Sequence, residues 1–210
     1  LEDYTGHKCT NCPAAATIAT QLEDDTALGV IVVSIHASTD GSFQSTDEVE
    51  FTVDYQTDAG DAYVQEMPGF IGNPMGTINR NDGGYSNTNW YFSSNWATGV
   101  NNEISQGNLD ANVQLQYNYY PSTNGLFIHT ETTFLNTLSG NYHLIVYLIR
   151  NDVVSPQKMN DGTIDHHYHH HAVLSKNING TWGTLVNDSA VVNGDVFYHD
   201  FSFELPDLST

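Results

Sequence analysis

The first sixteen residues, LEDYTGHKCTNCPAAA (residues 1–16), contain the main evidence for the predicted fold. They contain both cysteines of the chain, Cys9 and Cys12, at Cys-x-x-Cys spacing and just before the Ala-rich segment 13–22, which is predicted to be a helix. A helix N-terminus presents free N–H groups and the positive end of the helix dipole, which stabilise a thiolate at Cys9. The two residues before Cys9, a histidine and a lysine, add to this effect. The pair therefore predicts a short, reversible disulfide.

Other roles for the cysteine pair fit the sequence less well. A c-type haem site requires histidine after the second cysteine, and Pro13 stands there. A zinc site requires a second ligand pair, which only histidines far away in the chain can supply. Two unrelated structural cysteines at this spacing before a helix are improbable. The pair therefore favours a thioredoxin-like site.

Two further features support that prediction. In thioredoxin-like folds a cis-proline precedes a strand and faces the sulfurs, and the segment NPMGTI (residues 73–78) has this form at Pro74. An ordinary trans-proline turn is the alternative. Asp3, six residues before Cys9, matches the buried acid that assists proton transfer, although it is equally an exposed acid at a strand end, and Glu2 competes for the role. The predicted catalytic residues are Cys9, Cys12, Pro74 and Asp3.

The first half of the chain alternates between strand-like and helix-like segments. Residues 1–4, 29–37 and 76–80 are predicted as strands, and residues 13–22, 56–66 and 90–106 as helices. This alternation predicts an α/β thioredoxin-like domain over residues 1–107.

The second half alternates apolar and polar residues over 111–120 and continues with apolar segments separated by Gly and Asn turns. Residues 126–135 and 142–150, and runs centred on Val173 and Phe197, complete a pattern of several strands without a helical period. We therefore expect an all-β immunoglobulin-like sandwich over residues 108–210.

Charge limits the kinds of partner. The chain has 25 Asp and Glu against five Lys and Arg, a formal net charge of -20. Such a surface repels nucleic acid and anionic lipid, so neither is an expected partner. No apolar run reaches the roughly 18 residues that span a bilayer, and the longest candidate, Leu144–Ile149, is predicted to be a buried strand. Because both ends resemble interrupted strands, we expect a mature or trimmed fragment of an exported protein.

The whole pattern resembles a known family. Residues 1–16 together with GNPMGTINR (residues 72–80) and NGTWG (residues 179–183) are similar to the Bacteroidetes outer-membrane protein family named for a 28-kilodalton member. The resemblance covers nearly the whole chain. It implies a thioredoxin-like domain followed by an immunoglobulin-like domain at the cell surface, and it says little about activity.

A histidine-rich segment, DHHYHHH, occupies residues 165–171. On a strand, His167, His169 and His171 share one face and can chelate Zn²⁺, Cu²⁺ or Ni²⁺. The alternative is an exposed edge strand that tolerates histidines. The related family has Tyr-x-His-x-His nearby, which only Tyr168 and His170 match. We expect no fully formed structural metal site here.

Weaker motifs add two modification candidates. Thr26 and Ser189 stand in Asp–Ser/Thr–Ala triplets that resemble O-glycosylation sites of exported Bacteroidetes proteins. The sequence has no EF-hand loop, no Gly-rich phosphate loop after a strand and no Gly-x-Ser-x-Gly elbow, so it predicts no cofactor.

Two functional hypotheses follow. The first is an extracytoplasmic binding or assembly protein, secreted or associated with the outer membrane or cell surface, that contacts a protein partner there. The second is a thiol–disulfide oxidoreductase in which Cys9 is the nucleophile and Cys12 resolves the mixed disulfide. We favour the first, because an outer surface has no obvious electron supply to regenerate a dithiol.

Overall fold

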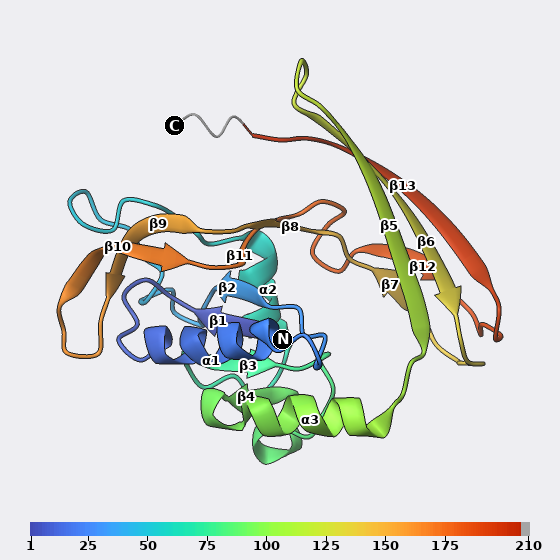
Figure 1. The fold of residues 1–210 in the computed structure, drawn as a ribbon, viewed down its shortest axis with the longest axis horizontal. Helices are drawn as coiled ribbons and strands as arrows, with labels where there is room; N and C mark the ends of the chain where they lie inside the picture. The colour runs from blue at the N-terminus through green and yellow to red at the C-terminus, as the bar shows by residue number, and fades with distance from the viewer. Residues whose placement is uncertain (207–210) are drawn as a thin grey trace. The chain divides into compact units, whose positions relative to one another are not determined.

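The computed structural model describes residues 1–206, which divide into two compact units (Figure 1). Unit 1 contains Leu1–Gly107 and Tyr147–Lys176, and unit 2 contains Asn108–Val146 and the described residues from 177 to 206. Unit 1 thus includes residues 147–176, which were predicted to lie in the second domain. The chain crosses between the units three times.

Unit 1 is built on a six-stranded sheet with the order β4-β3-β1-β2-β11-β8. Its strands are β1 (Glu2–Thr5), β2 (Val33–His36), β3 (Met75–Thr77), β4 (Trp90–Phe92), β8 (Tyr147–Arg150) and β11 (Val173–Asn177). Strand β1 is parallel to β2 and antiparallel to β3. The last two strands come from the second half of the chain, so the sheet is completed late in the sequence.

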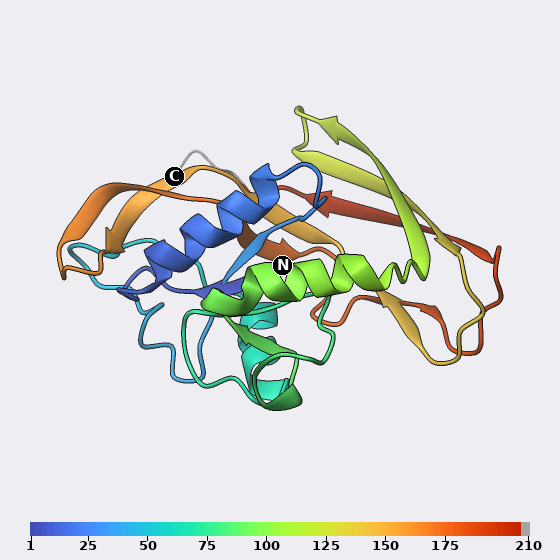
Figure 2. The same cartoon turned by 60° about the horizontal axis from the view of Figure 1, so that its bottom comes forward.

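Three helices cover this sheet. They are α1 (Cys12–Asp24), α2 (Asp58–Glu66) and α3 (Trp96–Gln106), with two short 3-10 turns at Tyr85–Asn87 and Ser93–Asn95. Helices α1 and α3 lie on one face (Figure 2) and share a core with Trp96, whereas α2 packs on the other face against Tyr4 and Ile35. Helix α2 starts where the Thr57 hydroxyl accepts a hydrogen bond from the Gly60 N–H at 3.0 Å.

A partly buried ion pair ties the returning segment to this sheet. Arg80 donates two hydrogen bonds to the Glu2 carboxylate, at 2.8 and 2.9 Å. The Tyr147 hydroxyl of β8 donates to the same carboxylate at 3.0 Å, and the guanidinium lies 3.9 Å from the centre of the Tyr63 ring. These contacts join β1, β8, α2 and the segment after β3.

A two-stranded hairpin also belongs to unit 1. It consists of β9 (Val153–Lys158) and β10 (Ile164–His170), and its pairing shifts register between Asp165 and Tyr168. This bulge interrupts the strict alternation of side chains expected across the histidine-rich segment.

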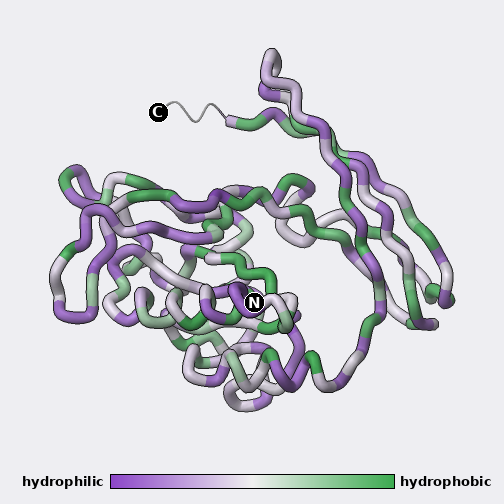
Figure 3. The backbone as a smooth tube through the Cα atoms, in the orientation of Figure 1, coloured by the Kyte–Doolittle hydropathy of each residue, from purple (hydrophilic) through white to green (hydrophobic). Residues whose placement is uncertain are grey.

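Unit 2 has a three-stranded sheet with the order β13-β6-β5 and a two-stranded sheet of β12 and β7. Their bounds are β5 (Ala111–Tyr120), β6 (Gly125–Phe134), β7 (Tyr142–Leu144), β12 (Thr184–Asn187) and β13 (Val196–Glu204). Hydrophobic and hydrophilic residues alternate along the three long strands (Figure 3). The core of the unit is formed by Leu126, Ile128 and Val146.

The predicted fold class is wrong. The protein is mostly β, with 36% strand and 19% helix, and has several sheets and three short α-helices in the described residues. It is not an α/β thioredoxin-like domain followed by an immunoglobulin-like sandwich. The predicted strand 29–37 shortens to β2, and the predicted helix 90–106 begins with strand β4. The second half contributes two strands to the first sheet instead of forming a separate sandwich.

The predicted strand Leu144–Ile149 is also interrupted, and one side chain explains the break. Asn179 accepts a hydrogen bond from the Val146 N–H at 2.9 Å and donates one to the Leu144 carbonyl at 2.7 Å. These bonds replace strand pairing at the point where the chain leaves β7 and enters β8.

Candidate functional site

The predicted disulfide between Cys9 and Cys12 is present, with the two Cα atoms 5.4 Å apart. It lies in the turn that joins β1 to α1. The Cys9 N–H donates to the Gly6 carbonyl at 3.0 Å, and Cys12 is the first residue of α1. The prediction of a sulfur pair at a helix start is therefore confirmed.

The disulfide is buried and bonded to the hairpin of β9 and β10. Cys9 is 2% exposed and Cys12 is 1% exposed. The Gln157 side chain donates to the Cys9 carbonyl at 3.1 Å, and the Lys158 N–H donates to the His7 carbonyl at 2.8 Å. A reaction partner as large as a protein therefore has no direct access to either sulfur in this conformation.

The positive charges expected beside Cys9 are already engaged. The Lys8 ammonium lies 3.3 Å from the Asp47 carboxylate and 3.2 Å from the Ser45 hydroxyl. The His7 ring donates to the Ser45 carbonyl at 3.0 Å, and burial lowers the pKa of His7 despite the opposing effect of this bond. At neutral pH His7 is therefore uncharged, and neither residue offers a free cation to a Cys9 thiolate.

Pro74 lies at the same end of the sheet as the disulfide turn. The Asn73–Pro74 peptide bond is cis. Strand β3 begins at the next residue, Met75, which pairs with Tyr4 near the end of β1. Contact between Pro74 and the sulfurs, and a catalytic role for it, stay predictions.

Asp3 is fully buried in β1, and among residues 1–206 neither of its carboxylate oxygens has a hydrogen-bond partner. Burial raises the pKa of Asp3 to about 7. The strand register pairs Asp3 with Ser34 and Thr5 with His36, so these polar side chains share one face of the sheet. Within the described part of the chain, both ring nitrogens of His36 also lack hydrogen-bond partners, and burial lowers the pKa of His36 well below its usual value.

A cavity of about 450 Å³ lies on this face, within unit 1. Its lining includes Asp3, Cys12, His36, Gln157, Tyr168 and His170. The rings of His36 and His170 are 5.7 Å apart, and burial lowers the pKa of His170 to about 4. The cavity therefore combines an acid that titrates near neutral pH, neutral imidazoles and one sulfur of the disulfide.

Sequence reasoning misses His36 and His170 as members of this site. The segment around β2 reads as a continuous apolar run, although Ser34 and His36 alternate with Val33 and Ile35. This two-residue period could have predicted the role of His36, because it indicates that a buried strand has one polar face.

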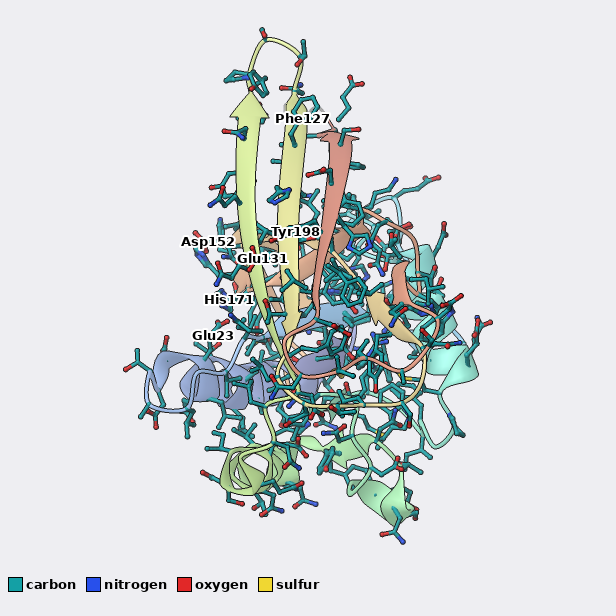
Figure 4. The ribbon with its side chains drawn as sticks, turned by 90° about the vertical axis from the view of Figure 1, so that its right-hand side faces the viewer. Glu23, Phe127, Glu131, Asp152, His171 and Tyr198 are labelled. Carbon is teal, nitrogen blue, oxygen red and sulfur yellow. A yellow bond between two sulfur atoms is a disulfide. The ribbon has the colours of Figure 1, made fainter. Side chains whose placement is uncertain are left out.

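Two exposed histidines of the histidine-rich segment 165–171 each contact a different carboxylate. The His171 ring lies 2.5 Å from the Glu23 carboxylate of α1, and His169 contacts Asp152. Figure 4 labels His171, Glu23 and Asp152. His167 is also exposed. Within residues 1–206, no three His, Cys, Asp or Glu side chains stand where they could hold one metal ion. Metal binding by His167, His169 and His171 stays a prediction.

The two glycosylation candidates are exposed. Thr26 follows α1, and Ser189 follows β12. Modification of these hydroxyls also stays a prediction.

A second candidate surface lies on β5. We call it the β5 face, and it consists of Val113, Leu115, Tyr117 and Tyr119, which are 51%, 51%, 67% and 45% exposed. The register pairs Leu115 with Thr130 and Tyr117 with Ile128 of β6, both of which are buried. The β5 face therefore lies on the same side of the sheet as the buried side chains of β6, but it is exposed to solvent. The opposite side carries Phe127, Glu131 and Tyr198 (Figure 4).

Comparison with known proteins adds the family. A search of curated proteins found no match. Among solved structures, protein AGR_C_4864 from Agrobacterium tumefaciens is similar, with a TM-score of 0.54 and 11% sequence identity over 95% of this chain and 76% of that one. At this identity the likeness concerns the fold alone. No helix within residues 1–206 is long and apolar enough to cross a membrane. Residues 61–209 match the family described as Outer membrane protein Omp28, so the chain belongs to that family.

Proposed function

We propose that this chain is an outer-membrane-associated binding or assembly protein that contacts a protein partner at the cell surface through the β5 face. The family supports the association with the outer membrane. The β5 face carries the rest of the proposal. Four adjacent apolar or aromatic side chains are about half exposed or more in a chain whose formal net charge is -20. Contiguous exposed apolar surface of this kind marks interaction sites.

The surroundings of the disulfide support a structural role for it within this function. Both sulfurs are buried, Gln157 binds the Cys9 carbonyl, and Lys8 is already paired with Asp47. A disulfide that turns over is accessible and has a stabilised thiolate. A binding protein needs neither property.

Capture of partners from outer-membrane extracts tests the proposal. Leu115→Lys and Tyr117→Lys place a charge on the β5 face, and we expect each to reduce recovery of the partner at least about tenfold, equivalent to about 1.4 kcal/mol. Tyr198→Lys is the matched control, because Tyr198 is 61% exposed on the opposite side of the same sheet. Circular dichroism checks that all variants fold. Equal recovery with Leu115→Lys, Tyr117→Lys and Tyr198→Lys would refute the β5 face as the binding surface.

A thiol–disulfide oxidoreductase is the second candidate, favoured by the cavity that Cys12 and the buried acid Asp3 both line. In such a reaction the Cys9 thiolate attacks a substrate disulfide and forms a mixed disulfide. The Cys12 thiolate then displaces the reduced substrate and closes the Cys9–Cys12 bond, so the two electrons pass to the substrate.

The reduction potential against glutathione separates the candidates. A potential below about -300 mV, the range of structural disulfides, without insulin reduction would eliminate the oxidoreductase. A potential above about -230 mV, with insulin reduction lost in Cys9→Ser, would instead establish it.

A further inference from the structure

We infer that two copies of this chain associate by antiparallel pairing of β5 with β5, which joins their three-stranded sheets into one six-stranded sheet. The inference rests on the proposed function and deepens it, since it names one partner of β5 and uses both the strand edge and the β5 face. The edge supplies backbone hydrogen bonds, and the face supplies side-chain contacts.

The outer edge of β5 is suited to pairing. The order β13-β6-β5 places β5 at the end of its sheet, and β6 is its sole partner strand within residues 1–206. Its register with β6 runs from Ala111 to Tyr120 without a shift, so the unpaired N–H and C=O groups form a regular row. Proteins normally protect such an edge with charges, proline or bulges. The segment ANVQLQYNYY contains no charged residue and no proline.

The sequence of β5 is self-complementary in one antiparallel register. With the two-fold axis at Gln116, Val113 of each copy lies opposite Tyr119 of the other, and Leu115 lies opposite Tyr117. Directly opposed side chains have Cβ atoms about 4.5–5.5 Å apart, and aromatic–aliphatic pairs of this kind stabilise a sheet. The register therefore buries parts of the β5 face of each copy against the other.

The polar side of the same register is also matched. Gln114 lies opposite Asn118, and Gln116 lies opposite its own copy, so amide side chains face one another. A two-fold contact of this kind is closed and uses the same surface on both copies.

Charge distinguishes this edge from the other one. Two chains of net charge -20 repel each other, so a contact between copies is least opposed where charges are absent. β5 has none, whereas β13 at the other edge carries Asp200 and Glu204. Pairing of β5 with β13 of another copy would in addition leave both outer edges open and produce chains of molecules without closure.

Analytical ultracentrifugation of the full chain tests the inference. We expect a dimer at about 100 µM protein, and its association should strengthen between about 0.05 and 0.5 M NaCl, because salt screens the repulsion between the copies. Gln116→Lys places two like charges opposite each other at the axis and should weaken the dimer at least about tenfold. Tyr198→Lys on the other edge strand should leave it unchanged.

A single cysteine at the axis gives an independent readout. In the chain with its Cys9–Cys12 disulfide closed, Gln116→Cys should form a covalent dimer under mild oxidation, and Tyr198→Cys should not. A wild-type monomer at every salt concentration would overturn the inference. An open-ended assembly, a dimer sensitive to Tyr198→Lys, or a dimer that Gln116→Cys does not cross-link would also overturn it.

The outcomes also separate this inference from the proposed function. A monomer that still captures a partner through Leu115 refutes the dimer and leaves the binding function intact. A dimer that captures no partner refutes the binding function and leaves the dimer intact.

Discussion

Replacing Asp3 by asparagine should change how the stability of the protein depends on pH. Asp3 is buried and has no hydrogen-bond partner among the residues that the structure describes, and burial raises its pKa from 3.8 to about 7. In the unfolded chain the carboxyl ionises near its ordinary value. Between pH 4 and pH 7 the folded protein therefore retains a proton that the unfolded chain has lost, and stability falls as pH rises through this window.

The size of the effect follows from the two pKa values. One pKa unit corresponds to about 1.36 kcal/mol, so the rise from 3.8 to about 7 amounts to roughly 4 kcal/mol, fully developed above pH 7. Asparagine has no proton to lose. The free energy of unfolding of Asp3→Asn minus that of wild type should therefore increase by about 4 kcal/mol between pH 4 and pH 8.

Urea unfolding at several pH values measures this difference. The comparison of variant with wild type cancels the contributions of the other carboxylates, and any pH-independent cost of the buried amide shifts the whole curve without changing its slope. Asp82→Asn is the control for the loss of one carboxyl, because Asp82 is exposed in the same unit. An Asp3→Asn difference that varies by less than about 1 kcal/mol over this range would refute the reasoning from burial.

Three further changes have predicted outcomes. Arg80→Met leaves the partly buried Glu2 carboxylate without its ion pair. Urea unfolding should show a loss of about 2 kcal/mol, between the values of surface pairs and of fully buried pairs. An unchanged midpoint would show that the pair is dispensable. Cys9→Ser combined with Cys12→Ser removes a disulfide that closes a very short loop. Thermal unfolding should therefore show a decrease of only about 2 kcal/mol in the free energy of unfolding. A much larger decrease would mean that the sulfurs also stabilise the position of the hairpin. Gly183 has φ +75°, and an added Cβ would lie 2.2 Å from the Leu144 carbonyl oxygen. Gly183→Ala should therefore lower the free energy of unfolding in urea by at least about 2 kcal/mol. An unchanged free energy would contradict the close approach of the two backbone segments at this turn.

Local features of the site could be predicted from the sequence. The Cys9–Cys12 bond and the start of α1 follow from spacing and composition within a few residues. The predicted helix 56–66 likewise begins within two residues of the observed start of α2 at Asp58. Such features depend on neighbours in the chain, which a single sequence displays directly.

Long-range features could not be predicted in this way. The pairing of β11 with β2 joins Val173 to Ser34, and no periodic pattern specifies which distant strand completes a sheet. The same holds for Gln157 over the disulfide turn and for Asn179 at the break between β7 and β8. These side chains form hydrogen bonds with backbone groups far away in the sequence. That an amide residue stands at these positions therefore indicates a contact only after the topology is known.

The threefold crossing of the chain between its units has a consequence for biosynthesis. A ribosome or export channel delivers the polypeptide from its N-terminus, and the first 107 residues contain only the strands β1 to β4 of the six-stranded sheet. Strands β8 and β11 emerge only after β5, β6 and β7 have been delivered. During that interval the edge of β2 that later receives β11 is unpaired, and it is available to a chaperone or to another nascent chain. Shortened versions of this protein that end at residue 107 would retain that open edge permanently.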